Sequence, residues 1–374
     1  MAGKESNRLS TPPGRITLHD VAREAEVSAA TVSKVLSGAK GAIRISKQTR
    51  ERVMAVARRM NYIPNASAQA LRRGSLSAIG LYFPFGLHPW VSSAYSQLTR
   101  HISILLEEER HSLVIMINPP PRKKAEPARF PSFLYNQGVD GVICVHQVPE
   151  ALLEELRQRK MPYVLLNCDT GYPENCVDAD ERWVMQQSLQ YVYDLGHRRI
   201  IFAGRSTSHP SYDIKREVYV EFMKRKGLPA LPDVYEITDP LSDERGDFGE
   251  KIAERILRQA ERPTAIVAYN DITALALIHA FRDRGISIPE EISIVGCDDI
   301  HESLVARPRL TTFRFPADRL AKAAVEMVLK QVRTHEPQKS IAVKHEFLAR
   351  DSCVQLAESR SHRAKRPASA GAFK

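Results

Sequence analysis

The chain has 374 residues, of which 43% are hydrophobic and 26% are charged, and its formal net charge is +10 at pH 7. This length indicates two or three domains, and the composition is typical of a soluble globular protein. No run approaches the roughly 18–20 apolar residues of a membrane span, and the polar N-terminus lacks the apolar segment of a signal peptide. We therefore expect a cytoplasmic protein that is not held in a membrane.

The cysteines are odd in number and scattered, and none forms a C-x2-C pair. Cys168 and Cys176 are too loosely spaced to match a zinc motif. We predict free thiols in a reducing compartment, with no metal and no cofactor. The five are Cys144, Cys168, Cys176, Cys297 and Cys353.

Residues 1–15 are predicted to be a disordered arm, and two short helical patterns follow it. Thr17 can cap the first helix with Asp20 as its capping-box partner, and Ser28 can cap the second. The tight turn falls at residues 25–27. The apolar positions follow helical spacing, at Leu18, Val21, Ala22 and Ala25 and then at Val32, Val35 and Leu36. This is the helix-turn-helix pattern, although an ordinary helical hairpin would look similar.

The positive charge is concentrated at the two ends of the chain. Residues 1–75 hold 14 Lys/Arg and 5 Asp/Glu, a net charge of +9, and the last twenty residues carry +4. Of the total of +10, residues 76–354 therefore carry −3. Such a distribution favours a phosphate-binding headpiece on a nearly neutral body.

A third helix and a short hinge follow the helix-turn-helix. Ser46 can cap the third helix, whose apolar face holds Val53, Ala57 and Met60. Its end is expected at Tyr62-Ile63-Pro64, because the residue before a proline resists helical geometry. Residues 65–74 could form about two helical turns, a length that is marginal in water. A hinge that folds only with DNA and a second subunit would have this pattern.

From Ser77 onward, short apolar runs alternate with helical patterns of 10–15 residues, which predicts parallel sheets. With so many strands, one barrel or two doubly wound sheets are both possible. The expected strands are 78–83, 113–117, 141–145, 163–166, 199–203, 265–268 and 292–295. The expected helices are 92–109, 130–137, 151–159, 182–195, 215–226, 248–259, 272–284 and 317–334. Residues 119–124 are expected to form a loop.

The chain has no G-x-G-x-x-G, Walker A or G-x-S-x-G motif, so we do not expect an enzyme. Asp298, Asp299 and His301 could suggest a metal site, but no third ligand is apparent.

The headpiece carries the motifs T-L-x-D-V-A at 17–22, V-S-x-x-T-V-S at 27–33, T-R-E-R-V at 49–53, N-Y-I-P-N-A at 61–66 and A-x-x-L-R at 68–72. With these motifs it resembles the LacI/GalR family of bacterial transcription regulators. Further matches run through the body, including 139–143, 195–200, 262–266, 270–271, 288–300 and 309–312. The loop 38–45 is longer than the family's usual one.

The resemblance implies an α/β fold: an all-α helix-turn-helix headpiece and two doubly wound lobes, as in a periplasmic sugar-binding protein. The DNA-binding domain is expected at 16–64 and the hinge with its linker at 65–76. The N-terminal lobe would comprise 77–177 and 301–336, and the C-terminal lobe 178–300 and 337–354. Residues 355–374 would be a disordered basic tail.

The resemblance also implies a homodimer on a pseudo-palindromic DNA operator. Ala29, Ala30 and Lys34 would read base edges in the major groove, where alanine methyls can pack on thymine and lysine can donate to guanine. Leu71 would wedge into a central minor-groove step, with Arg72 beside it in that groove. Backbone contacts are expected from Thr17, Ser28, Thr31, Ser33, Tyr62 and Asn65.

Ligands of open α/β sheets sit beyond the carboxyl ends of the strands. The effector candidates at such positions are Phe85, His88, Trp90, His146, Asp169, Lys215, Phe248 and Asp271. Trp90 with Asp271 suggests a saccharide, because a ring packs on a pyranose and a carboxylate pairs with its hydroxyls. Trp90 could instead close the lobes or lie at a dimer face, and the role of Asp271 could instead be limited to capping the following helix.

Three departures from the family pattern make the effector hard to assign. Lys215 stands where many members have an arginine, Val218 replaces a common glycine, and residues 85–90 differ from the usual loop. We expect a repressor with a saccharide effector, associated with the nucleoid. The alternatives are a nucleobase or nucleoside effector, or a transport-type sugar-binding protein.

Overall fold

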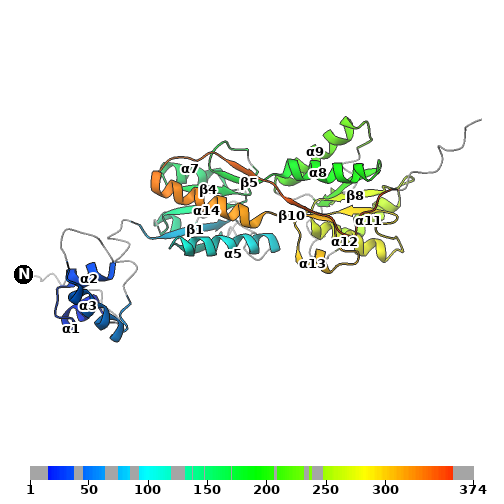
Figure 1. Cartoon of the computed structure of the whole chain (residues 1–374). Helices are drawn as coiled ribbons and strands as arrows, with labels where there is room; N and C mark the ends of the chain where they lie inside the picture. Colours follow the sequence, from blue (N-terminus) through cyan, green and yellow to red (C-terminus); the bar gives the residue numbers. More distant parts are fainter. Residues whose placement is uncertain are drawn as a thin grey trace, which may run out of the picture. The chain divides into compact units, whose positions relative to one another are not determined.

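The computed structural model describes residues 16–37, 45–63, 75–84, 92–118, 131–136, 138–146, 148–169, 171–205, 209–230, 236–237 and 247–356. The chain divides into two compact units, Met1–Leu76 and Ser77–Lys374 (Figure 1). The expected N-terminal arm, hinge helix, loop 119–124 and residues 357–374 of the tail lie outside the described residues.

The headpiece has the three expected helices, α1 (Leu18–Glu24), α2 (Ala29–Ser37) and α3 (Lys47–Arg59). The predicted capping box is confirmed, because Thr17 accepts a hydrogen bond from the Asp20 backbone N–H and Asp20 accepts one from the Thr17 N–H. Apolar faces of all three helices meet in one core. That core comprises Val21, Ala22, Ala25, Val32, Val35, Val53, Val56 and Ala57.

Helix α3 ends earlier than the proline predicts, and for a different reason. Asn61 has a left-handed backbone with φ 49°. The Tyr62 N–H donates to the Ala57 carbonyl at 2.9 Å, and the Asn61 N–H donates to the Arg58 carbonyl at 3.1 Å. This pair of bonds is a Schellman motif, in which asparagine tolerates the left-handed position.

The N-terminal lobe is built on a six-stranded parallel sheet in the order β11-β5-β4-β3-β1-β2. Its strands are β1 (Ala78–Phe83), β2 (Ser112–Ile117), β3 (Gly141–Val145), β4 (Tyr163–Leu166), β5 (Cys176–Ala179) and β11 (Ile341–Val343). Helices α5 (Ser93–Glu108) and α14 (Ala317–Thr334) pack on one face. Helices α6 (Ser132–Tyr135) and α7 (Glu150–Gln158) pack on the other (Figure 1).

The C-terminal lobe repeats this plan on a four-stranded parallel sheet in the order β7-β6-β8-β9. Its strands are β6 (Ile200–Arg205), β7 (Glu236–Ile237), β8 (Ala265–Ala268) and β9 (Ser293–Val295). Helices α8 (Glu181–Asp194) and α9 (Ser211–Arg225) cover one face. Helices α11 (Phe248–Leu257) and α12 (Asp271–Arg282) cover the other. The body is therefore two doubly wound sheets and not one barrel.

The lobe boundaries differ from those expected at 177/178 and 336/337. Strand β5 runs to Ala179 within the N-terminal sheet, and β11 pairs with its free edge. Before α14, the short helix α13 (His301–Val305) packs with the C-terminal lobe, where Ser303 bonds to Asp271. An antiparallel ribbon of β10 (Thr312–Arg314) and β12 (Glu346–Leu348) joins the lobes. Edge pairing of this kind depends on distant segments, so local patterns do not predict it.

None of the described helices is long and apolar enough to cross a membrane.

Candidate functional site

The outer face of α2 carries the small side chains that the sequence predicts. Ala30 is exposed, whereas Ala29 packs partly against the headpiece core. Lys34 is half-buried in the last turn of the helix. Ala30 is therefore the most accessible of the three predicted base-reading residues, and Ala29 also has a packing role.

The hydroxyls predicted to meet phosphates also begin the helices. The Thr17 hydroxyl donates to Asp20 Oδ2 at 2.6 Å. Ser28 Oγ accepts from the Thr31 N–H at 3.1 Å and lies 2.9 Å from Thr31 Oγ1. Ser33 is half-buried. A phosphate contact through Thr17, Ser28 or Thr31 would share these groups with helix capping.

The remaining predicted DNA contacts divide between described and undescribed residues. Tyr62 packs partly against the headpiece core. Asn65, Leu71 and Arg72 lie outside the described residues, and so do the effector candidates Phe85, His88 and Trp90.

Three residues that follow strands β3 and β4 lie at the contact between the two lobes. His146, Asn167 and Asp169 all have left-handed backbones, with φ of 65°, 53° and 50°. They meet His209 of the other lobe. Its ring lies 4.3 Å from the His146 ring, and its Nδ1 lies 3.5 Å from Asp169 Oδ2. Left-handed non-glycine residues gather at functional sites, and strand ends are where such folds bind ligands.

The hydrogen bonds of His209 determine its protonation. Its Nε2 donates to the Asn167 carbonyl at 2.9 Å, and its Nδ1 accepts from the Ser211 N–H at 3.2 Å. An imidazole that donates at one nitrogen and accepts at the other is neutral. Burial, in agreement, lowers the pKa of His209.

Burial also shifts two of the predicted effector residues toward their neutral forms. It lowers the pKa of His146 to about 4, with a smaller effect from His209. It raises the pKa of Asp169 to about 8, helped by the nearby Glu181 and Asp178 carboxylates. At neutral pH this contact between the lobes therefore depends on hydrogen bonds more than on charge.

Lys215 forms a buried ion pair with the first residue of α8, Glu181. Its Nζ lies 2.9 Å from Glu181 Oε2 and donates to the Tyr269 carbonyl at 3.1 Å. Burial opposes the ammonium form, yet the pKa of Lys215 stays well above its usual value. Burial raises the pKa of the adjacent Cys297 thiol, which therefore stays protonated and uncharged. We therefore attribute the raised pKa of Lys215 to the Glu181 carboxylate.

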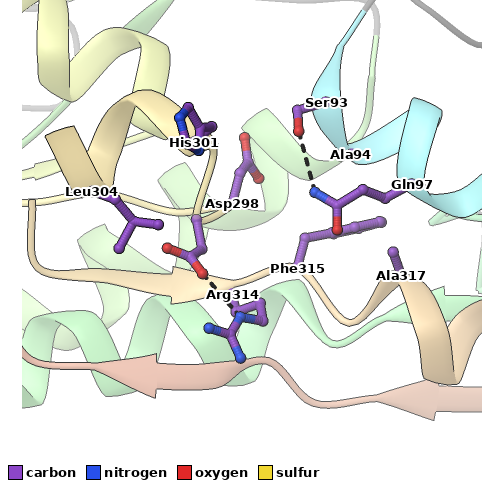
Figure 2. A pocket seen from close by; sticks show the side chains of 10 residues that line it. Ser93, Ala94, Gln97, Asp298, His301, Leu304, Arg314, Phe315 and Ala317 are labelled. Atoms are coloured by element: carbon purple, nitrogen blue, oxygen red, sulfur yellow. Dashed lines mark hydrogen bonds and ion pairs between the residues drawn. The ribbon is translucent and has the colours of Figure 1, made fainter.

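A cavity of about 240 Å³ opens between α5 of one lobe and the loop after β9 of the other (Figure 2). Gln97 comes from α5 and Asp298 from that loop, His301 is the first residue of α13, and Phe315 also lines the cavity. The backbone of Asp298 is strained, with φ 128°. The lining residues are Ser93, Ala94, Gln97, Asp298, Asp299, His301, Leu304, Arg314, Phe315 and Ala317.

Asp271 does not line this cavity, and its carboxylate is used inside the lobe. Its side chain is fully buried and accepts from the Ser303 hydroxyl at 2.6 Å, the Ile300 N–H at 3.1 Å and the Thr312 hydroxyl at 2.5 Å. Asn270, the preceding residue, caps α12. Instead of the predicted effector contact, this geometry supports a role in positioning the loop that carries Asp298.

Phe248, the first residue of α11, packs against the core of the C-terminal lobe and is half-buried. It does not line the 240 Å³ cavity.

Sequence reasoning missed several residues that converge on the cleft. Glu181 begins a helix after the lobe crossing, and His209 precedes α9. Asp298 and His301 were considered only as metal ligands, yet they line the cavity. The one local signal was Lys215 itself, because a lysine among apolar helix positions requires a buried acidic partner.

Comparison with known proteins links both regions to regulators. Residues 17–65 match the family described as "Bacterial regulatory proteins, lacI family", and residues 189–353 match a periplasmic binding protein-like domain. The chain is 30% identical over 319 residues to the HTH-type transcriptional regulator GalS of Salmonella typhimurium, which covers 84% of this chain and 89% of GalS. It is 29% identical over 332 residues to the catabolite control protein A of Priestia megaterium, covering 87% of this chain and 95% of that protein.

A solved structure of the Lac repressor dimer, bound to operator and the anti-inducer ONPF, matches with a TM-score of 0.77. Its sequence is 24% identical, and the match covers 91% of this chain and 99% of that one. This likeness establishes the fold, including the two-lobed body.

Proposed function

The chain belongs to the LacI family of bacterial regulatory proteins, and from this membership we propose that it is a repressor whose operator affinity a saccharide controls. The observation that carries the proposal is the combination in one chain of a basic helix-turn-helix unit and a two-lobed body with a polar cleft. A transport protein would need no such headpiece. Operator binding would keep the protein in the cytoplasm, on the nucleoid.

On DNA, α2 would lie in the major groove with its N-terminal half toward the bases. Ala30 offers only a methyl group and Lys34 one donor, so direct reading of bases is sparse. Specificity would then also depend on DNA bending at Leu71 and on half-site spacing.

The operator proposal is tested by selecting bound sequences from random DNA and locating them in the genome. We expect a pseudo-palindrome. Lys34→Ala should weaken binding by roughly 1–3 kcal/mol at one base pair per half-site. An equal loss on every sequence would instead make Lys34 a phosphate contact, and a chain that selects no sequence would contradict the proposal.

Leu71 provides a second test, because its proposed wedge acts on DNA and not on the effector. Leu71→Ala should weaken operator binding, since the extra contacts made by bent DNA are lost. Effector binding should stay unchanged. Unaltered operator affinity in a fluorescence titration would exclude this role for Leu71.

The effector would occupy the cavity beside Asp298, which has a volume of about 240 Å³. A second cavity of about 540 Å³ shares Gln97, Arg314, Phe315 and Ala317 with it. Asp298 and Gln97 can pair with sugar hydroxyls, and the Phe315 ring offers an apolar surface.

Control of operator affinity would come from the angle between the lobes. Residues from both lobes already touch at the His146 and His209 rings. An effector that binds one arrangement more tightly shifts the population toward it, and with it the spacing of the hinges in a dimer.

The effector proposal is tested by thermal shift and operator titration with glucose, galactose, ribose and cytidine. We expect a sugar to raise the melting temperature and change operator affinity, and Asp298→Asn to remove both effects. Glu302→Gln, which changes an exposed carboxylate of α13 that does not line the cavity, is the control for general damage to this region. A response to cytidine alone would favour a nucleoside effector.

A further inference from the structure

Two buried thiols of the N-terminal lobe meet between strands β4 and β5. Cys168 follows β4, and Cys176 is the first residue of β5. Their sulfur atoms lie 3.9 Å apart, and each residue is about 1% exposed. The parallel pairing of the two strands brings the cysteines together, although they match no zinc motif in the sequence.

Asp178 of β5 adds an oxygen to this pair. Its Oδ2 lies 4.0 Å from Cys168 Sγ, and its Oδ1 accepts from the backbone N–H groups of Cys168 at 2.8 Å and Asp169 at 3.2 Å. One potential ligand atom from each of Cys168, Cys176 and Asp178 lies within 4.8 Å of the others. The carboxylate is therefore held in place by the backbone, with one oxygen left toward the sulfurs.

This spacing matches a shared metal ion. Two thiolates that each stand about 2.3 Å from a tetrahedral zinc ion are about 3.8 Å apart. We propose that Cys168, Cys176 and Asp178 bind one Zn²⁺ ion. Soft sulfur ligands favour zinc over the hard cations magnesium and calcium.

On binding, the two thiols release their protons to solvent, so that two thiolates and one carboxylate face a doubly charged cation. The site then carries a net charge of −1, and its Asp178 is half-buried.

The site is linked to the contact between the lobes. Asp178 accepts a hydrogen bond from the backbone N–H of Asp169, and Asp169 Oδ2 lies 3.5 Å from His209 Nδ1 across the lobes. Metal binding would therefore fix the turn that carries Asp169.

The test is a titration of the reduced, chelator-treated full chain with Cd²⁺, followed by the ultraviolet absorption of the thiolate–cadmium bond, with Zn²⁺ as competitor. We expect one ion per chain. Cys168→Ser and Cys176→Ser should each weaken binding by at least about 100-fold, because each removes a direct ligand. Cys144→Ser is the matched control, since Cys144 is a fully buried thiol in the same apolar cluster.

A second measurement separates lost ligation from lost folding. Zn²⁺ should raise the melting temperature of the wild type and of Cys144→Ser, but not of the other two serine variants. Asp178→Asn keeps both thiols and should weaken binding by about tenfold. It is the variant to use if a serine variant does not fold. A wild type without the absorption band, or a band that survives in both serine variants, would show that the thiols are only in van der Waals contact.

Discussion

Lys215 and Glu181 form an ion pair that has almost no contact with solvent, since their side chains are 7% and 8% exposed. A buried pair contributes little net stability, but removing one partner leaves an uncompensated charge. Because the pair joins the first turn of α9 to the start of α8, its loss would also disturb the C-terminal side of the cleft.

Lys215→Met should lower the free energy of unfolding by roughly 3–5 kcal/mol, because Glu181 would remain buried and charged. The double variant Lys215→Met/Glu181→Leu should recover most of this loss, since both charges are then absent. Urea unfolding of the wild type, the two single variants and the double variant measures the coupling. Additive losses would show that the two residues act independently.

His345 is a second buried titratable group, with a side chain 4% exposed and neither ring nitrogen hydrogen-bonded within the described part of the chain. Burial lowers its pKa to about 4, with smaller effects from Glu181, Lys215, Asp180 and Arg319. The unfolded chain therefore binds a proton here below about pH 6.5, whereas the folded chain does so only near pH 4.

His345→Gln removes this proton uptake. Relative to the variant, the wild type should lose roughly 2–3 kcal/mol of unfolding free energy as the pH falls from about 6.5 to about 4. Comparing the two proteins cancels the opposite contribution of Asp169, whose raised pKa favours the folded state at lower pH. A difference between them that is independent of pH would mean that His345 is protonated in the folded protein.

At the scale of the elements, the predictions that succeeded depend on local chemistry. The start of α1 was predictable because a capping box needs only Thr17 and Asp20, three residues apart. The central strands were predictable because a parallel strand is buried on both faces and reads as an apolar run. The end of α3 was predicted from Pro64, but it is determined by the left-handed Asn61.

The features that the sequence did not predict depend on contacts between distant elements. Nothing near Asp271 in the sequence indicates that its carboxylate accepts from Ser303 and Thr312. The short strands β10, β11 and β12 have three residues each, which is too short for a periodic pattern. Cys168 and Cys176 likewise show no relation in the sequence, because only the pairing of β4 with β5 brings them together.

At the scale of the whole molecule, an apolar surface on the N-terminal lobe supports the proposed homodimer. Strand β2 is an edge of the six-stranded sheet. It exposes Ile115 and Ile117, at 44% and 40%, and Ile104 of the neighbouring α5 is 44% exposed. Large apolar side chains beside an unpaired strand edge are a liability unless another surface covers them. A second copy of the chain would do so and would place two headpieces on one operator.

Ile115→Glu tests this arrangement, because a charge at a two-fold interface faces its own copy across the axis. We expect the variant to sediment as a monomer at micromolar concentration. Its operator affinity should fall by at least about tenfold, since each chain then binds a half-site alone. Ile341→Glu is the matched control, because Ile341 is 43% exposed at the opposite edge of the same sheet. If the Ile115 variant remains dimeric and binds the operator normally, the dimer forms through a different surface, and the hinge spacing must then be controlled from there.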